Sequence, residues 1–348
     1  MHPYDFEQRR SLLRATGAMG AASLACAFAP LRAQAQAAPL TIGLLRNPVS
    51  ALVAITEQKG WFRKAGVNYG SVLFAGAAGP KVIQAMGSGS IALGSVSVTA
   101  AMLAIAQGVP LKILSVSTDP APAFALVSAG EIGSMQQLAG RKVATTAGTG
   151  LHYFLARALS KSGMTFKDIE FVNLPVADAQ AAFLARRVDA VVPSLNGRYF
   201  IRSARKDARE LFTHESFALP PGPAVRFDNY DVFVAPQAVV DSRTEALRGF
   251  LSAYHGEAVP YLNQAATRAA AITEITRYVN IEQKAPVDEA SMRAQLDASR
   301  FLNLAEMRTL LASDTYQAGL EDQVRFFTEL RQVPAGFSMA QATARGLI

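Results

Sequence analysis

The chain has 348 residues, of which 50% are apolar and 18% charged, with 25 glycines, 17 prolines and a single cysteine. This is the composition of an ordinary globular protein, and the length allows one large core or two lobes. The formal net charge of +7 is dispersed without a long run of lysine or arginine, so it gives little support to nucleic-acid binding.

The amino-terminal segment has the pattern of a secretory signal. A basic start leads into an apolar stretch over residues 15–31, and Ala-x-Ala triplets follow it. We therefore expect residues 1–37 to be a signal peptide that is removed on export, rather than a membrane anchor, because the stretch is short and rich in Ala and Gly. The adjacent Arg9 and Arg10 resemble a twin-arginine signal, and the export route stays open.

Cleavage after Ala37 would remove four basic and two acidic residues and lower the net charge from +7 to +5. It would also remove Cys26, the one cysteine of the chain. The residues before Cys26 make a poor lipidation signal, since Ser23 stands where a leucine is usual. The mature protein would then have no disulfide, no thiolate nucleophile and no cysteine metal ligand.

From Leu40 onward, short apolar runs alternate with stretches of helical period, which is typical of an α/β fold. In chain order, the sequence predicts strands at 40–45, 67–74, 91–94, 111–117, 124–128, 141–145, 169–174, 188–192, 210–213 and 230–234. It predicts helices at 51–62, 79–86, 97–107, 151–162, 177–186, 198–206, 244–262 and 267–279, with one or two more between 304 and 330.

This order of elements predicts two α/β lobes. The first lobe comprises 38–117 and 230–348, with a helical carboxy-terminal tail packed on it, and the second comprises 124–224. The chain crosses between them near 118–123 and 225–229, and two crossings form a hinge. A cleft between two lobes is where small ligands usually bind.

Five strand-to-helix turns are rich in small and polar residues, and they lie at 46–48, 75–80, 94–97, 146–152 and 193–196. In open parallel sheets, ligands bind at this edge. Free N–H groups and the positive end of the dipole at a helix start also favour an anion. Capping and turn formation explain any one turn at least as well, but the five together favour a cleft that binds a small anion.

Other motifs point away from catalysis. His152 lies at a predicted helix start, where it is either structural or a ligand contact. His214 and His255 have no partners at metal-ligand spacing, so no metal site is expected. The sequence contains no nucleophile elbow, phosphate-binding loop or paired-carboxylate motif, and we expect no cofactor.

Four arginines recur at helical spacing: Arg198, Arg202, Arg205 and Arg209. A solvated helix face is the simpler interpretation of this stripe. The alternative is a docking surface for a transporter subunit or for anionic headgroups.

Several stretches together resemble the periplasmic binding proteins for aliphatic sulfonates, taurine and nitrate. The resemblance lies in EQKGWFRKAGV at 57–67, AMGSGSIA with Gly94 at 85–94, LAGRKVA with Gly148, Thr149 and His152 at 138–152, and DAQAAF with VDA at 178–190. It covers nearly the whole mature chain. Its order along the chain is more specific than any one motif.

The resemblance implies a type II periplasmic binding fold and a monomeric solute-binding component of an ABC importer, which delivers a small organic anion to an inner-membrane permease. The solute would be a sulfonate, a taurine-like molecule or a carboxylate. The residues that correspond to ligand contacts are Asn47, Gly76, Ala77, Ser95, Ser97, Thr149, Gly150 and His152. Asn196, in the fifth turn, joins them as a candidate, although relatives often carry a Trp before a Pro there.

Two alternatives remain open at this point. Relatives on the same scaffold include a desulfinase and a thiamine-pyrimidine synthase, and both look to depend on cysteine, which this mature chain would lack. A cysteine-independent acid/base enzyme is still compatible with the sequence. So is a binding protein that serves a sensor instead of a transporter.

Overall fold

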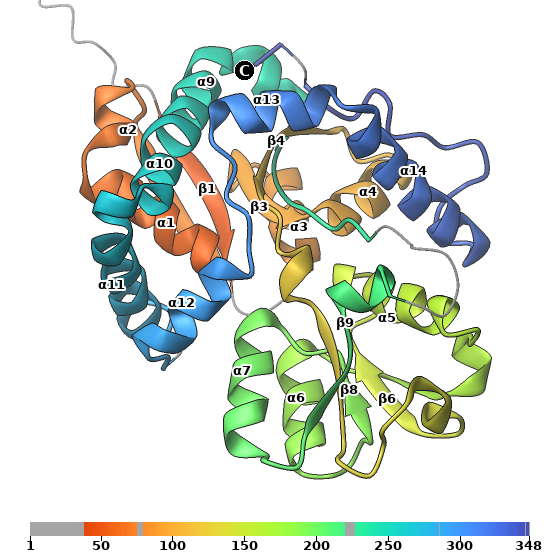
Figure 1. Ribbon diagram of the computed structural model, residues 1–348. Coiled ribbons are helices and arrows are strands. Elements are labelled where there is room, and N and C mark those ends of the chain that lie inside the picture. The colour runs from red at the N-terminus through yellow and green to blue at the C-terminus, as the bar shows by residue number, and fades with distance from the viewer. Residues whose placement is uncertain (1–37, 75–78, 220–226, 285, 345, 348) are drawn as a thin grey trace, which may run out of the picture. The chain divides into compact units, whose positions relative to one another are not determined.

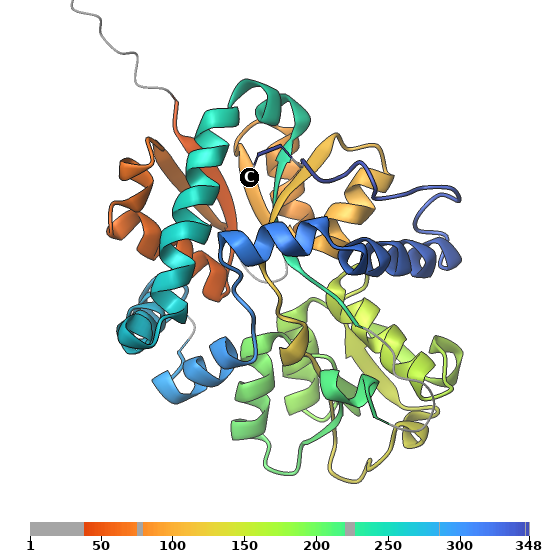
Figure 2. The ribbon, with the colours of Figure 1, turned by 45° about the horizontal axis from the view of Figure 1, so that its top comes forward.

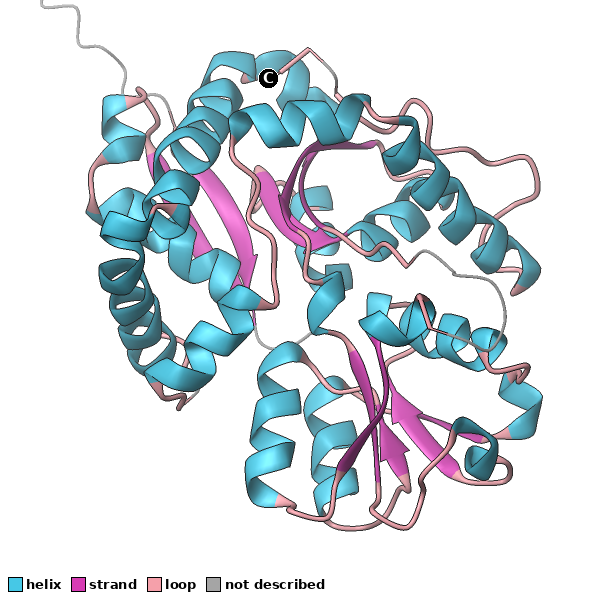
Figure 3. Cartoon of the chain, in the orientation of Figure 1, coloured by secondary structure: helices cyan, strands magenta, loops and turns pink. Residues whose placement is uncertain are grey.

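A computed structural model describes residues 38–348 except 75–78, 220–226, 285, 345 and 348, and residues 38–348 form one compact unit. Within it lie two five-stranded sheets with helices packed on them (Figures 1 and 3). No helix in the described part of the chain is long and apolar enough to cross a membrane. The predicted signal segment lies outside the described residues.

The first sheet has the strand order β2-β1-β3-β10-β4. Its strands are β1 (Leu40–Leu45), β2 (Tyr69–Phe74), β3 (Leu93–Ser97), β4 (Leu111–Thr118) and β10 (Asp231–Pro236). Strand β1 pairs in parallel with β2 and β3, whereas β10 is antiparallel to both β3 and β4. A strand that returns late in the sequence therefore sits between two early ones.

Helices cover both faces of the first sheet. One apolar cluster joins β1 to α1 (Pro48–Gln58), α9 (Thr244–Ala253) and α11 (Ala265–Ile281). Residues of α3 (Gly79–Gly87) and α4 (Val98–Ala106) belong to another cluster, which continues into the core around α5 (Gly150–Lys161). Because this second cluster runs on without a break, the two sheets share buried apolar contacts.

The second sheet has the strand order β7-β6-β8-β5-β9. Its strands are β5 (Ala125–Ser128), β6 (Lys142–Thr145), β7 (Glu170–Asn173), β8 (Ala190–Val191) and β9 (Arg209–Thr213). Helices α5, α6 (Val176–Leu184) and α7 (Leu195–Ala204) lie beside this sheet (Figure 1). Strand β6 is parallel to β7 and β8, and β5 is antiparallel to β8 and β9.

The chain passes between the sheets twice, from β4 to β5 and from β9 to β10. The first passage contains the short helix η1 (Ala121–Ala123), and much of the second lies outside the described residues. The final helices are α12 (Glu289–Asp297), α13 (Leu304–Ala312) and α14 (Asp314–Glu329), which Figure 2 shows in blue. Helix α12 contacts α7, and the Tyr153 hydroxyl of α5 donates a hydrogen bond to Asp322 of α14. The tail therefore also contacts helices that belong to the second sheet.

Several helices differ from the sequence prediction in their boundaries. The helix predicted at 51–62 is divided, because Gly60 has a φ of 72° and separates α1 from α2 (Trp61–Lys64). Residues 244–263 form α9, a π-helical turn η5 (Tyr254–Ala258) and α10 (Val259–Asn263), with Pro260 near the start of α10. Helix α7 starts at Leu195, three residues earlier than predicted, because the Ser194 hydroxyl accepts a hydrogen bond from Gly197 N.

Candidate functional site

A cavity of about 270 Å³ lies where helices of both sheets begin. That volume is just below the range of about 300–1,000 Å³ usual for ligand pockets. Its walls combine turn residues with apolar side chains. The lining residues are Leu45, Arg46, Asn47, Pro48, Val49, Gly79, Pro80, Ser97, Ala100, Thr118, Pro120, Phe124, Thr149, Gly150, Leu151, Val176, Ala177, Gln180, Ser194, Leu195, Asn229, Asp231, Ser299 and Phe301.

Helix starts dominate this wall. Among the described residues, the first turns of α1, α3, α4, α5, α6 and α7 all contribute lining positions. The N–H groups of a first turn have no partner within their own helix, and the helix dipole adds partial positive charge there. The arrangement therefore surrounds the cavity with groups that favour an anion without a buried lysine.

Short polar side chains set where four of these helices begin. Asn47 caps α1 by accepting from Ser50 N at 3.2 Å, and Ser97 caps α4 by accepting from Ala100 N at 3.3 Å. Thr149 and Ser194 cap α5 and α7 in the same manner. Each cap satisfies one N–H of its helix and leaves others for a bound group.

The structure brings four of the nine predicted site residues to the cavity wall: Asn47, Ser97, Thr149 and Gly150. Ser95, His152 and Asn196 do not line it. Gly76 and Ala77 lie outside the described residues.

His152 directly follows the lining residue Leu151 but faces an aromatic cluster. Only 5% of its surface is exposed, and its ring centroid lies 5.0 Å from that of Phe166 and 5.3 Å from that of Phe171. Burial lowers the pKa of His152 to about 4, so the imidazole is neutral at pH 7. Its Nδ1 accepts from Gly148 N at 3.4 Å, and through this bond His152 supports the turn that carries Thr149.

Ser95 and Asn196 are neighbours of the wall. Ser95 is buried within β3, and its Oγ has no hydrogen-bond partner among the described residues. Asn196 follows the lining residues Ser194 and Leu195, and its buried Oδ1 likewise has no partner in the part of the chain that is described. Neither residue reaches the cavity surface in this structure.

Sequence reasoning missed several lining residues, and the most consequential is Asp231, the first residue of β10. Its carboxylate accepts from Asn47 Nδ2 at 3.5 Å. Burial raises the pKa of Asp231 to about 7, and the nearby Asp119 carboxylate adds to that rise. The signal was visible as an Asp at the start of a predicted strand, but only the topology places that strand beside β3.

Gly150 packs directly against Asn229 on the opposite side of the wall. A Cβ built on Gly150 would lie 2.3 Å from Asn229 Nδ2. The Asn229 side chain is held in turn by Thr99, whose hydroxyl lies 3.1 Å from Asn229 Oδ1. A larger residue at position 150 would displace the Asn229 side chain, because the start of α5 and the return to β10 meet there.

Two mixed sheets, two chain crossings and a cavity at the helix starts define an α/β protein with the type II periplasmic binding fold. The chain belongs to the NMT1/THI5-like family, which it matches over residues 47–259. The matched residues include most strands of both sheets.

Solved structures of low identity share this fold. The alkanesulfonate-binding protein SsuA from Xanthomonas axonopodis pv. citri, bound to MOPS, aligns with a TM-score of 0.70 at 20% identity, covering 88% of this chain and 98% of that one. Among curated proteins, the taurine-binding periplasmic protein of Escherichia coli K12 is 22% identical over 90% of this chain and 93% of its own length.

Another Escherichia coli K12 protein, named for the binding of aliphatic sulfonates, is 38% identical over 116 residues. That alignment covers 32% of this chain and 36% of the relative. The alignments to the first curated relatives thus span about a third to a half of their lengths.

Proposed function

We propose that this protein is the exported, periplasmic solute-binding component of an ABC importer, and that it holds a small organic anion in the cavity between its two sheets. The solute class is a sulfonate or a carboxylate. The observation that carries this proposal is the convergence of six helix starts, among the described residues, on one cavity of about 270 Å³.

Two further observations support the proposal. The wall includes turn residues that follow strands of both sheets, so a bound solute would touch both and favour their approach. The relatives reported above carry the names of sulfonate- and taurine-binding proteins, and this chain shares their family or their fold. A permease at the inner membrane is then the partner that receives the solute.

A ligand screen tests the proposal. Thermal shift of the purified protein with alkanesulfonates, taurine, short carboxylates, nitrate and pyrimidines should give hits among the sulfonates or carboxylates. Calorimetry then measures the affinity of each hit. A protein that binds none of the anions at millimolar concentration would refute the proposed function.

A single substitution places the hit in the cavity. Ala177 is exposed, lines the cavity and occupies the first turn of α6, where an acidic side chain suits the helix dipole. Ala177→Asp should therefore fold normally and weaken anion binding at least tenfold by repulsion and obstruction. Ala181→Asp, exposed on the same helix but not lining the cavity, is the control and should bind as the wild type does.

One observation favours a second function, a cysteine-independent acid/base enzyme. A carboxyl group whose pKa lies near 7 in a cavity, as at Asp231, is suited to general acid or base catalysis. Incubating each hit with the protein and following it by NMR separates the two functions. A solute that is recovered unchanged supports binding, and any product formed at a rate that Asp231→Asn abolishes supports catalysis.

A further inference from the structure

A second cavity, of about 420 Å³, lies between α5 and α14. Its walls are the second half of α5, the loop that follows it, the short helix η3 (Phe166–Asp168) and α14. None of its lining residues also lines the solute cavity, so the two spaces are separate. The volume falls within the range of about 300–1,000 Å³ usual for ligand pockets.

One face of α14 forms a complete wall of this second cavity. Asp322, Arg325, Phe326, Glu329 and Leu330 recur at intervals of three and four residues, which places them on one side of the helix and its end. Leu330 is 37% exposed, and few other large apolar side chains of the described residues are exposed to that extent. The face therefore combines charged groups with apolar surface that the protein does not cover.

Two aromatic rings reach the cavity from different elements. Phe166 belongs to η3 and Phe326 to α14, and both line the space. Each packs on the buried ring of His152, with centroids 5.0 and 6.2 Å away, but within the described chain the two phenylalanine rings do not contact each other. A flat ring that enters between them would gain aromatic contacts with both.

The charges of the lining leave positive capacity unused. The Asp322 carboxylate accepts from Tyr153 Oη at 2.6 Å and pairs with Arg325 at 2.9 Å and Arg157 at 3.4 Å. Lys167 is exposed, and its side chain makes no hydrogen bond or ion pair with any described residue. Arg157 Nε is buried and also lacks a partner there. With three cationic and two acidic side chains, the lining has a formal charge of +1.

We propose that this second cavity binds an aromatic carboxylate, with the ring between Phe166 and Phe326 and the carboxylate beside Lys167. Ring contacts and a charge-assisted hydrogen bond then satisfy the two kinds of surface that the protein leaves open. The occupant bridges α5, whose first turn lines the solute cavity, and α14 of the tail. The inference does not depend on the proposed function, because the two linings share no residue.

A fluorinated pair of probes tests the site. The carboxylate is 4-(trifluoromethyl)phenylacetate, and its neutral isostere is the corresponding amide. Fluorine NMR titration of the purified protein should show the carboxylate binding, with the amide about tenfold weaker. The variant Ala177→Asp, which obstructs the solute cavity, should bind the carboxylate as the wild type does, because the probe occupies the other space.

Two variants of exposed residues address the second cavity itself. Lys167→Glu reverses the charge of the proposed partner and should weaken the carboxylate by at least about tenfold, while the amide changes little. Its control is Lys206→Glu, the same change at an exposed lysine outside the lining. Ser160→Tyr, in the last turn of α5, places a ring in the cavity and should abolish binding of both probes. Thermal unfolding checks that each variant is folded.

The outcomes separate a second site from the solute cavity. If Ala177→Asp abolishes binding of the carboxylate while Lys167→Glu and Ser160→Tyr leave it intact, the probe lies in the solute cavity and the second site is refuted. If the wild type does not bind the carboxylate at millimolar concentration, or binds the amide equally well, the inference is also wrong. Neither result would alter the proposed function.

Discussion

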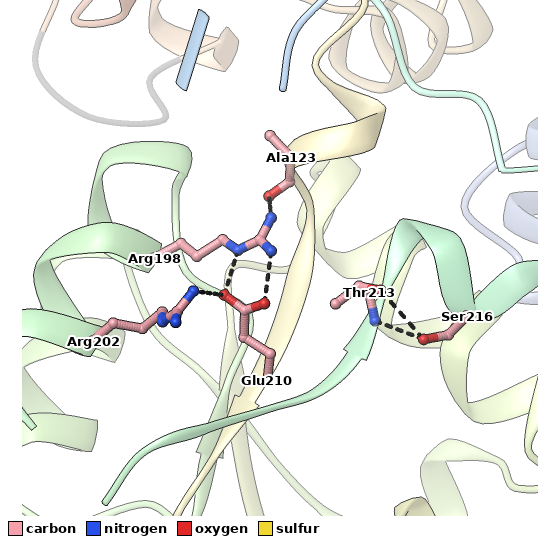
Figure 4. A network of polar contacts seen from close by, with 6 residues as sticks. All are labelled: Ala123, Arg198, Arg202, Glu210, Thr213 and Ser216. Carbon is pink, nitrogen blue, oxygen red and sulfur yellow. Dashed lines mark hydrogen bonds and ion pairs between the residues drawn. The ribbon is translucent and has the colours of Figure 1, made fainter. Parts of the chain in front are cut away.

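The ion pair between Arg198 and Glu210 offers a sharp test of how the wall of the cavity is held in place. Arg198 of α7 donates from Nε and Nη2 to the two oxygens of Glu210 at 2.8 and 2.7 Å, and from Nη1 to the Ala123 carbonyl at 2.8 Å (Figure 4). Ala123 lies in η1, between the lining residues Pro120 and Phe124. The perturbation is Arg198→Met, which keeps an unbranched apolar stem, shortens the side chain and removes all three bonds.

The structure sets the expected cost. Removing one partner of a buried ion pair costs about 3–5 kcal/mol, because the other charge stays buried. The side chains of Arg198 and Glu210 are 15% and 18% exposed, and Arg202 Nη1 remains 3.2 Å from Glu210 Oε1. We therefore expect the lower end, a loss of about 3 kcal/mol in the free energy of unfolding.

Arg202→Met is the matched control, since it removes one bond to the same carboxylate from a side chain that is 59% exposed. Its cost should stay below about 1 kcal/mol. Urea unfolding followed by circular dichroism measures both variants. Equal costs for the two arginines would refute the reasoning.

The pH dependence of the Arg198→Met effect gives a second check. The hydrogen bond from Arg198 lowers the pKa of Glu210. A carboxylate with a lowered pKa contributes stability that is present above its ordinary pKa and is lost as the pH falls through the folded-state value. The gap between wild type and Arg198→Met should therefore narrow in acid.

Gly150→Ala should lower the free energy of unfolding by about 1–3 kcal/mol and weaken binding, because its Cβ would collide with Asn229. The control is Gly256→Ala, which has open space around it and should be neutral or slightly stabilising in thermal unfolding. Burial lowers the pKa of His152 to about 4, so the folded protein loses stability as the pH falls from 6.5 towards 4. The variant His152→Phe should lose less stability over this range. If the free energy of unfolding of the variant falls with pH as steeply as that of the wild type, the prediction is wrong. The raised pKa of Asp231 has the opposite effect on stability, which falls as the pH rises from about 4 to 7. Asp119 and Tyr254 are titratable groups that interact with this carboxyl group. Asp231→Asn should therefore be more stable than wild type by about 2–4 kcal/mol above pH 7, and the gain should vanish towards pH 4.

The fold was largely predictable because its strands are short apolar runs with clear breaks. All ten predicted strands are present, and the boundaries differ by three residues or fewer. The errors lie in helices. The sequence around Gly60 keeps a helical period, yet the glycine takes a left-handed conformation that ends α1. The predicted helical tail sets no bounds for α12, although Asp288 caps that helix by accepting from Ser291 N.

The site was predictable only where it depends on local turn chemistry. Asn47, Ser97 and Thr149 cap helices, and capping residues can be recognised from sequence. For His152 the sequence left a structural role and a ligand contact both open, and the structure turns its side chain towards Phe166 and away from the lining. Such a rotation depends on tertiary packing, which the local pattern does not report.

The predicted arginine stripe shows the same limit, because Arg198 and Arg202 lie in α7, whereas Arg205 follows its last residue and Arg209 begins β9. Its spacing predicted either a solvated face or a docking surface. Arg205 is instead buried, donates to the Phe183 carbonyl at 2.9 Å and lies over the Phe183 ring at 4.4 Å. Arg198 is largely buried in its ion pair with Glu210, and Arg205 is buried as well. The four arginines therefore do not form one continuous exposed surface.

On the proposed function, we expect anion binding and solute selectivity to come from different parts of the chain. The groups that favour an anion are backbone N–H groups at helix starts, and their positions follow from the fold itself. Lining side chains that we expect to distinguish one solute from another stand elsewhere: Phe124 in the first crossing, Asp231 at the start of β10, and Phe301 between α12 and α13. Because these positions lie outside the helix starts, we expect substitutions there to change solute preference while the anion-favouring N–H groups stay in place.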